Sequence, residues 1–186
     1  MTQAAVILAA GGASRFSGPG HKLLAEWRGQ PLVTWAVANA LAAGLEETVV
    51  ITGAVDLSEV LPEEVTLIEN HAWSSGQASS LQVAVSWARH QGHTAIVVGL
   101  ADQPLVPPEA WLAVAAETSK PIVSATFEGR RRPPVRLDQS IWGLLPVGGD
   151  EGARVLMSAR PELVAEVACP GQPADVDTVE DLSRWS

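Results

Sequence analysis

The start of the chain constrains its fold more than any other feature. Residues 4–10 form an apolar run, and the glycine-rich segment 11–18 (Gly-Gly-Ala-Ser-Arg-Phe-Ser-Gly) follows directly. Glycine lets backbone N–H groups approach an anion closely, and Arg15 and Lys22 add positive charge nearby. Open α/β sheets bind ligands where such a strand ends. We therefore expect a triphosphate-binding site after a first buried strand.

Two common phosphate-binding loops do not fit this spacing. A P-loop has Ser or Thr directly after Gly-Lys, whereas Leu23 follows Lys22. A dinucleotide-binding fingerprint needs a third glycine at fixed spacing, and neither Gly11 nor Gly12 begins that pattern. The remaining alternative is a flexible surface turn. The coincidence of two cations with the end of a strand favours the anion site.

Length and charge narrow the class of protein. The chain has 186 residues, 47% of them hydrophobic, so we expect a single domain over residues 1–186. The net charge of −9 disfavours nucleic acid and anionic membrane surfaces as partners. Cys169 is the only cysteine, and the sequence shows no leader-like or membrane-spanning apolar stretch. These features predict a cytoplasmic protein.

Strand-like and helix-like segments alternate along most of the chain, which favours an α/β fold with a mostly parallel sheet between two layers of helices. We expect strands at 4–10, 48–52, 65–69, 94–100, 122–127 and 163–168. We expect helices at 31–43, 76–91, 107–118, 139–145 and 151–158, and a short one within 175–185 capped by Thr178. The basic, proline-rich segment 130–134 is expected to be a loop or hairpin tip.

A carboxylate follows the most apolar of these strands. Asp102 comes directly after the strand expected at 94–100, so it belongs at the same sheet edge as the glycine-rich loop if the two strands are neighbours. Mg²⁺ prefers one or two carboxylates together with phosphate oxygens. Asp102 therefore suits a metal that bridges the phosphates. The alternative is an Asp that caps the turn before Pro104.

The acidic tail offers a second metal ligand. Asp175, Asp177, Glu180 and Asp181 lie close together in sequence, and Asp177 is the residue that we predict to bind the metal. A capping box formed by Thr178 and Asp181 would explain the same pattern without a ligand.

The segment before the helix at 76–91 supplies hydrogen-bond donors. Gly76 and Ser80 lie in its first turn, where the positive end of the helix dipole favours an anionic ligand. The alternative is simple capping by Ser74 or Ser75. The segment 149–154 is either a helix cap with a surface arginine or part of a site for the second substrate.

Two other candidates are weaker. His90 and His93 flank Gly92 at a helix end with no third ligand in sight, so we expect a solvated pair rather than a metal site. The seven tryptophans are expected to pack the core or the helix faces.

Together these segments resemble the MobA-like nucleotidyltransferase family, and most closely its molybdenum cofactor cytidylyltransferase (MocA-like) branch. The resemblance runs nearly end to end. It rests on Leu-Ala-Ala-Gly-Gly-Ala-Ser-Arg at 8–15 with Lys22, and on the later segments 70–81, 102–105, 149–154 and 175–181, all in the family's order.

The resemblance implies a three-layer Rossmann-like fold and transfer of a nucleoside monophosphate from an NTP to a phosphorylated acceptor. It implies that the N-terminal loop contacts base and triphosphate, that Lys22 binds phosphate and that Asp102 binds Mg²⁺. Our mechanistic hypothesis adds Asp177 as a second Mg²⁺ ligand and Arg15 on the leaving pyrophosphate, so we expect Arg15, Lys22 and Asp102 to be catalytic. The Leu-Ala-Ala-Gly form points to CTP, with molybdopterin as the acceptor and a molybdoenzyme receiving the cofactor. The residues expected to bind the nucleotide are Leu8, Ala9, Ala10, Gly11, Gly12, Ser14, Arg15, Lys22, Gly76 and Ser80.

One segment departs from the family pattern. Arg132-Pro133-Pro134 stands where Gly-His-Pro is usual, near the acceptor. The acceptor is therefore open: a sugar phosphate or another phosphorylated metabolite is an alternative to molybdopterin. A binding protein that delivers nucleotide or cofactor without turnover is the alternative outside enzymes.

Overall fold

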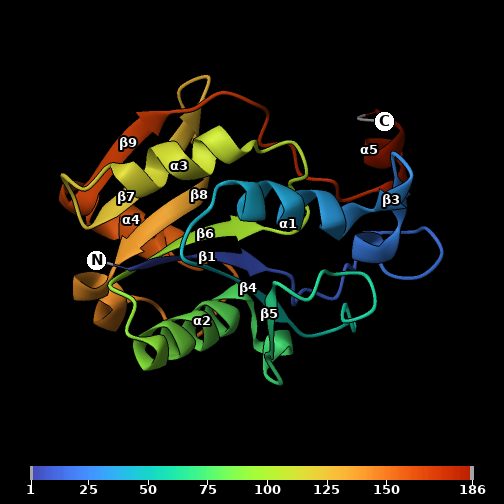
Figure 1. Ribbon diagram of the computed structural model, residues 1–186, viewed down its shortest axis with the longest axis horizontal. Helices are drawn as coiled ribbons and strands as arrows, with labels where there is room; N and C mark the ends of the chain where they lie inside the picture. The colour runs from blue at the N-terminus through green and yellow to red at the C-terminus, as the bar shows by residue number, and fades with distance from the viewer. Residues whose placement is uncertain (1, 185–186) are drawn as a thin grey trace.

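A computed structural model of the protein describes residues 2–184. Its core is a seven-stranded sheet with the order β5-β4-β1-β6-β8-β7-β9, in which β8 alone runs against the others (Figure 1). The strands are β1 (Gln3–Leu8), β4 (Glu47–Thr52), β5 (Thr66–Glu69), β6 (Ala95–Leu100), β7 (Ile122–Phe127), β8 (Arg130–Asp138) and β9 (Val164–Ala168). The mostly parallel α/β sheet is as predicted.

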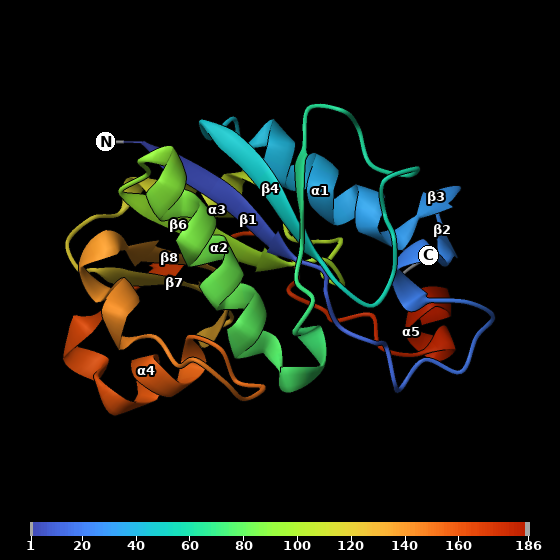
Figure 2. The same ribbon diagram turned by 90° about the horizontal axis from the view of Figure 1, so that it is seen from below.

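Helices cover both faces of this sheet and complete three layers. Helices α1 (Leu32–Ala42) and α3 (Pro108–Ala116) lie on one face, and α2 (Gln77–Gln91) and α4 (Arg154–Ala159) lie on the other (Figures 1 and 2). Short 3-10 helices span Lys22–Leu24, Trp73–Ser75, Gln139–Leu144 and Pro161–Leu163. Strand β1 has helices on both sides, which explains why its residues form a continuous apolar run.

The alternating side chains of the strands divide the core in two. Ala5 and Ile7 of β1 pack toward α1 and α3, whereas Val6 and Leu8 pack toward α2. Both halves are built mainly from aliphatic side chains with little exposed surface, so burial of apolar area is the main force that holds the layers together.

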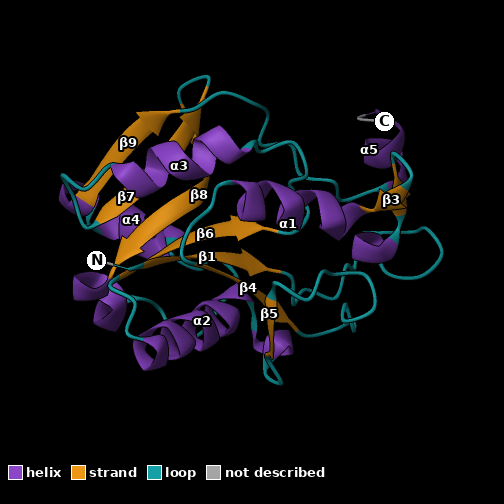
Figure 3. Ribbon diagram, viewed as in Figure 1, coloured by secondary structure: helices purple, strands orange, loops and turns teal. Residues whose placement is uncertain are grey.

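The loops that follow β1 and β6 gather at one edge of the sheet (Figure 3). A small hairpin of β2 (Glu26–Trp27) and β3 (Gln30–Pro31) and the short helix α5 (Val179–Arg184) lie beside each other at this end (Figures 1 and 2). Trp27 and Val176 pack together in a small apolar cluster there. This cluster fixes the acidic tail next to the N-terminal loop. Trp185, at the end of the predicted tail helix, lies outside the described residues.

The expectation of a loop at 130–134 is wrong. These residues form the first half of β8, and the hairpin tip is Glu128-Gly129, where both residues have positive φ angles of 50° and 75°. The ladder between β7 and β8 shifts register at Ser124/Ala125, and Pro133 and Pro134 lie in the resulting bulge. A bulge tolerates prolines because its residues need not donate to the ladder. Pairing of residues 130–132 with β7 outweighs the local sequence, and β6 joins β8 only from Val135 onward.

Among residues 2–184, no helix combines the length and the apolar character needed to cross a membrane.

Candidate active site

The glycine-rich loop after β1 is closed by a histidine. His21 Nδ1 accepts a hydrogen bond from the backbone N–H of Leu23 at 3.3 Å, so Nε2 is the atom that donates to the carbonyl of Gly11 at 2.9 Å. Burial lowers the pKa of His21, and nearby Lys22 lowers it further, against the effect of the Gly11 bond. A neutral imidazole therefore fastens the two ends of the loop together.

Lys22 joins the loop to two other segments of the chain. Its Nζ lies 2.7 Å from Oδ2 of Asp102, after β6, and 2.8 Å from Oδ1 of Asp177, in the tail. Burial alone would lower the pKa of Lys22, but the two carboxylates together outweigh it and raise this pKa. Arg15 reaches the other oxygen of Asp177 at 3.0 Å from the solvent side. These four side chains form a charge network at the sheet edge.

The structure confirms the capping interpretation of the acidic tail, and the metal-binding role of Asp177 stays a prediction. Thr178 Oγ1 accepts from the backbone N–H of Asp181 at 3.2 Å, and Asp181 Oδ2 accepts from the N–H of Thr178 at 2.9 Å. This capping box begins α5. Asp177 is thereby free to turn its carboxylate toward Lys22.

The N-terminus of α2 forms the opposite wall. Its N-cap residue is Gly76, with no side-chain cap, so the expectation of capping by Ser74 or Ser75 is wrong. Gly76 has φ 105°, and a Cβ there would lie 2.5 Å from the carbonyl oxygen of Gly149, so glycine alone fits this approach of two loops. Asn70 anchors the same turn by donating to Ser79 and Ser80.

These segments enclose a cavity of about 720 Å³. The structure brings every residue that the sequence predicts for nucleotide and metal to its lining: Leu8, Ala9, Ala10, Gly11, Gly12, Ser14, Arg15, Lys22, Gly76, Ser80, Asp102 and Asp177. The cavity thus combines backbone amides of a glycine loop, a helix N-terminus and a cation–carboxylate network.

Several lining residues were not predicted. Trp73 reaches to 3.0 Å from where a Cβ on Gly12 would lie, so it packs against the loop instead of the core. Asp175 also lines the cavity, and its Oδ1 accepts from Gln103 Nε2 at 2.7 Å. Burial raises the pKa of Asp175, and the charges of Asp102 and Asp177 add to this effect, against the Gln103 bond. The alternating acidic residues of the tail were the sequence signal that could have identified Asp175. Only the tertiary packing shows which of them contacts which partner.

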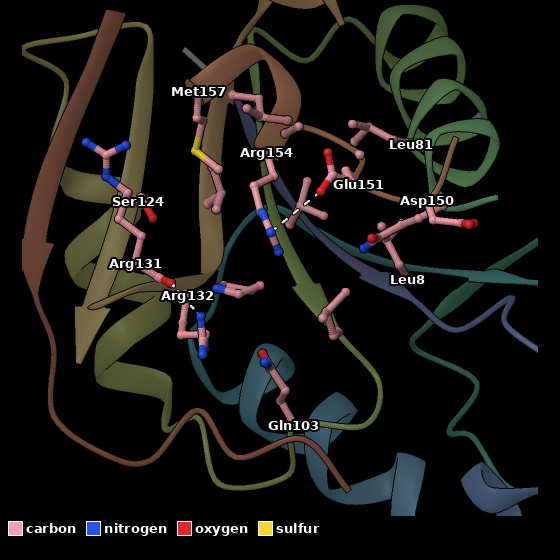
Figure 4. A pocket seen from close by; sticks show the side chains of 18 of the residues that line it. Leu8, Leu81, Gln103, Ser124, Arg131, Arg132, Asp150, Glu151, Arg154 and Met157 are labelled. Carbon is pink, nitrogen blue, oxygen red and sulfur yellow. Dashed lines mark hydrogen bonds and ion pairs between the residues drawn. The ribbon is translucent and has the colours of Figure 1, made fainter. Parts of the chain in front are cut away.

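A second cavity, of about 730 Å³, shares a wall with the first. Residues that line both are Leu8, Gln77, Leu100, Asp150, Arg154 and Asp175. Its floor is apolar, with Leu81 and Met157, and three arginines lie around it: Arg131, Arg132 and Arg154 (Figure 4). The segment 149–154 therefore contributes to both cavities, and Arg154 also pairs with Glu151 at 3.5 Å.

The residues at the first cavity fit a divalent cation that arrives with phosphate oxygens. Asp102 and Asp177 point at one common position, which the ammonium of Lys22 takes as a stand-in cation. Within residues 2–184, no group of three or more His, Cys, Asp or Glu side chains converges as a ready metal site. The two carboxylates alone supply fewer ligands than Mg²⁺ requires, so nucleotide and water would have to complete the set.

The expectation of a solvated histidine pair is wrong for one member. His90 is exposed, but His93 is buried, lies 5.3 Å from the Trp87 ring and finds no hydrogen-bond partner for either nitrogen within the described chain. Burial of the residue after Gly92 follows from helix packing, which the local sequence did not reveal.

Comparison with known proteins now identifies the family. The MobA-like NTP transferase domain matches residues 5–165, so the chain belongs to this nucleotidyltransferase family and the resemblance seen in the sequence is confirmed.

Two curated relatives cover nearly the whole chain. Nicotine blue oxidoreductase of Paenarthrobacter nicotinovorans is 35% identical over 96% of this chain and 94% of its own length. The purine catabolism protein PucB of Bacillus subtilis is 27% identical over 95% of this chain and 92% of its own.

Solved structures show the same fold. Rv0371c of Mycobacterium tuberculosis H37Rv superposes with a TM-score of 0.84 at 26% identity, over 99% of this chain and 97% of that one. The same protein in complex with manganese gives a TM-score of 0.79 at the same identity and coverage. A nucleotidyl transferase from Methanothermobacter gives 0.82 at 21% identity, over 99% and 95%, and shows the fold alone.

Proposed function

We propose that this protein transfers CMP from CTP to a phosphorylated acceptor, molybdopterin, and releases pyrophosphate. One observation carries the proposal: the cavity lined by the glycine loop, Lys22 and Asp102 shares a wall with a second, arginine-rimmed cavity. Two substrates bound in adjoining cavities can meet at that wall, as a transfer reaction requires.

The first cavity suits the nucleotide. Gly11, Gly12 and the N-terminus of α2 line it, and a glycine-rich loop and a helix N-terminus are both places where phosphate oxygens bind. Arg15 and Lys22 would hold the pyrophosphate that leaves. Backbone groups along 8–11 and Ser80 lie where they can meet the base. The choice of CTP rests on the Leu-Ala-Ala-Gly form of this segment.

The second cavity suits an acceptor with an apolar body and an anionic group. Arg132 and Arg154 supply charge, and Leu81 and Met157 supply an apolar floor. The acceptor phosphate would attack the α-phosphorus in line with departure of pyrophosphate. Since that phosphate is already anionic, no protein base has to activate it.

Asp102 and Asp177 would hold Mg²⁺, which supplies neutralisation of charge on the phosphates when bound. The manganese complex of the Mycobacterium tuberculosis neighbour supports a divalent metal here. The protein residues themselves orient the two substrates and hold the charged groups in a half-buried setting.

The test is release of pyrophosphate in the presence of Mg²⁺, with each of the four NTPs and with molybdopterin in its metal-free and molybdenum-loaded forms. Release with CTP and a pterin supports the proposal. Nucleotide binding without release on either pterin would contradict it and favour a different phosphorylated acceptor or a delivery protein.

A second candidate is an oxidoreductase activity, favoured by the name of the 35% identical relative. The same preparation can be tested for oxidation of NADH or NADPH with a dye as electron acceptor. Oxidation of the reduced nucleotide without pyrophosphate release from any NTP would favour this candidate over transfer.

A further inference from the structure

The ammonium group of Lys22 lies between the two carboxylates that the proposed function assigns to the metal. We propose that Lys22 serves as an intramolecular counter-ion. Its ammonium neutralises Asp102 and Asp177 until a triphosphate binds the ammonium, and a divalent cation then takes its position between the two carboxylates. This inference rests on the proposed function, because it takes these two carboxylates as the metal ligands.

One nitrogen atom, Lys22 Nζ, binds Asp102 Oδ2 at 2.7 Å and Asp177 Oδ1 at 2.8 Å, which are short, charge-assisted contacts. The lysine side chain is 13% exposed, so the contact is largely shielded from solvent. The two carboxylates come from segments that are far apart in the chain. The backbone N–H of Val176 donates to the carbonyl of Asp102 at 2.9 Å, so the two segments are held side by side and Lys22 compensates the charges of both carboxylates.

Repulsion between the two carboxylates favours a cation at this position. Without a cation between them, Asp102 and Asp177 would face each other as like charges, an arrangement that destabilises both ionised forms. Arg15 contacts Asp177 alone, and its side chain is 75% exposed, so it compensates little of this repulsion. A divalent ion must therefore displace Lys22 to bind, and it must compete with a cation that is covalently attached.

Exchange of the Lys22 ammonium for a divalent cation requires that the lysine side chain can move to another partner. Lysine carries its charge on a flexible four-carbon stem. Lys22 lines the same cavity as Gly11, Gly12 and Ser14, so a phosphate bound there would offer the ammonium a new partner. The two carboxylates would be released at the moment when phosphate oxygens become available to complete the coordination of the metal. Metal alone should bind weakly, and metal with nucleotide should bind well.

The test measures binding of Mn²⁺ in the absence of nucleotide, by titration calorimetry and by the electron paramagnetic resonance of free Mn²⁺. The Lys22→Met variant should bind Mn²⁺ more tightly than the unmodified protein, by about tenfold or more. The same substitution should weaken CTP binding, since it removes a phosphate contact. Arg15→Met is the matched control, because it removes a cation from the exposed side of Asp177, and it should change Mn²⁺ affinity by less than about threefold.

Thermal unfolding gives a second readout. Mn²⁺ should raise the melting temperature of Lys22→Met more than that of the unmodified protein, because a tighter ligand stabilises the folded state more. If Lys22→Met does not fold, Lys22→Gln, whose side chain is one atom shorter than lysine but keeps a hydrogen-bond donor without the charge, tests the same exchange.

The inference is overturned if Lys22→Met and Lys22→Gln bind Mn²⁺ no more tightly than the unmodified protein does. Pyrophosphate release by the unmodified protein separates the two proposals. Release together with unchanged Mn²⁺ binding in the variants contradicts the lysine exchange alone. Tighter Mn²⁺ binding without release supports the exchange and contradicts the transferase.

Discussion

The two adjoining cavities are nearly equal in volume, about 720 and 730 Å³, but they hold their charges in different ways. In the first, Lys22 is shielded and bound to two carboxylates, both of which come from other segments of the chain. In the second, Arg131 pairs with Glu166 and Arg154 pairs with Glu151. The side chain of Arg131 is 39% exposed and that of Arg154 is 73% exposed. In the absence of nucleotide the first network is held by short, shielded contacts, whereas the arginines of the second are exposed and can reorient.

This difference separates two tasks. Preorganised charges in a shielded site stabilise developing charge at little cost in reorganisation, which is what a chemical step needs. Exposed arginines adapt to the shape of a ligand and contribute mainly to its binding. We therefore expect substitutions in the first cavity to lower turnover, and substitutions in the second to change the affinity for the acceptor.

The largest effect is expected for Asp102→Asn. The variant keeps the shape of the side chain but removes a charge that pairs with Lys22 and would hold the metal. Pyrophosphate release should fall by about 10²-fold or more, the range for loss of one electrostatic contact in an active site. Glu63→Gln removes an exposed carboxylate elsewhere and should leave the rate unchanged. Near-normal release by Asp102→Asn would show that this network is not the chemical centre.

An intermediate effect is expected for Arg132→Gln in the second cavity. Its guanidinium lies at the rim, where it can bind an anionic acceptor (Figure 4). The KM for the acceptor should rise by about tenfold, the scale of one charge-assisted hydrogen bond, while the KM for the nucleotide stays the same. Arg130→Gln changes a neighbouring arginine outside the lining of either cavity and is the matched control. An equal rise in both KM values would contradict the division of tasks.

The sequence predicted the first region far better than the second. The strand and loop at 4–18 and Asp102 could be recognised because apolar runs, glycines and a following carboxylate are local signals. The first half of strand β8 could not, because its basic and proline residues disfavour a strand and become one only by pairing with β7, while β6 pairs with the second half.

Side-chain orientation was the other feature that could not be predicted from the sequence. Asp175 and Asp177 look alike in the sequence, yet one binds Gln103 and the other binds Lys22. The contact of Lys22 with both carboxylates depends on three segments meeting at the sheet edge. Motif order identified the participants, but only tertiary structure determines how they pair.

A smaller effect is expected for Asp175→Asn, on the wall that the two cavities share. Burial raises the pKa of Asp175 above its ordinary value of 3.8, so the folded state binds the proton more tightly than the unfolded chain. The resulting stabilisation is present below pH 3.8 and is lost as the pH rises through the folded pKa. At pH 7 the neutral variant, which still accepts from Gln103, should therefore be more stable, by up to about 1 kcal/mol.

Urea unfolding at several pH values measures this difference. The advantage of Asp175→Asn over the unmodified protein should shrink as the pH falls toward 3.8. A variant that is less stable at pH 7 would show that the charge of Asp175 is compensated better than its surroundings indicate.

The last effect, on stability alone, concerns His93, which precedes the amino end of β6, whereas the glycine-rich loop and Asp102 follow the carboxyl ends of β1 and β6. Its imidazole is buried against Trp87, neither nitrogen has a hydrogen-bond partner among residues 2–184, and Nε2 lies 3.9 Å from Oε2 of Glu47. A buried polar group without a partner costs free energy, so His93→Leu should raise the free energy of unfolding by about 1 kcal/mol and leave pyrophosphate release unchanged. His90→Leu, at an exposed position in the last turn of α2, should change stability by less than about 0.5 kcal/mol. A loss of stability in His93→Leu would mean that the imidazole is satisfied in solution, and a loss of release would mean that the amino end of the sheet is coupled to the cavities.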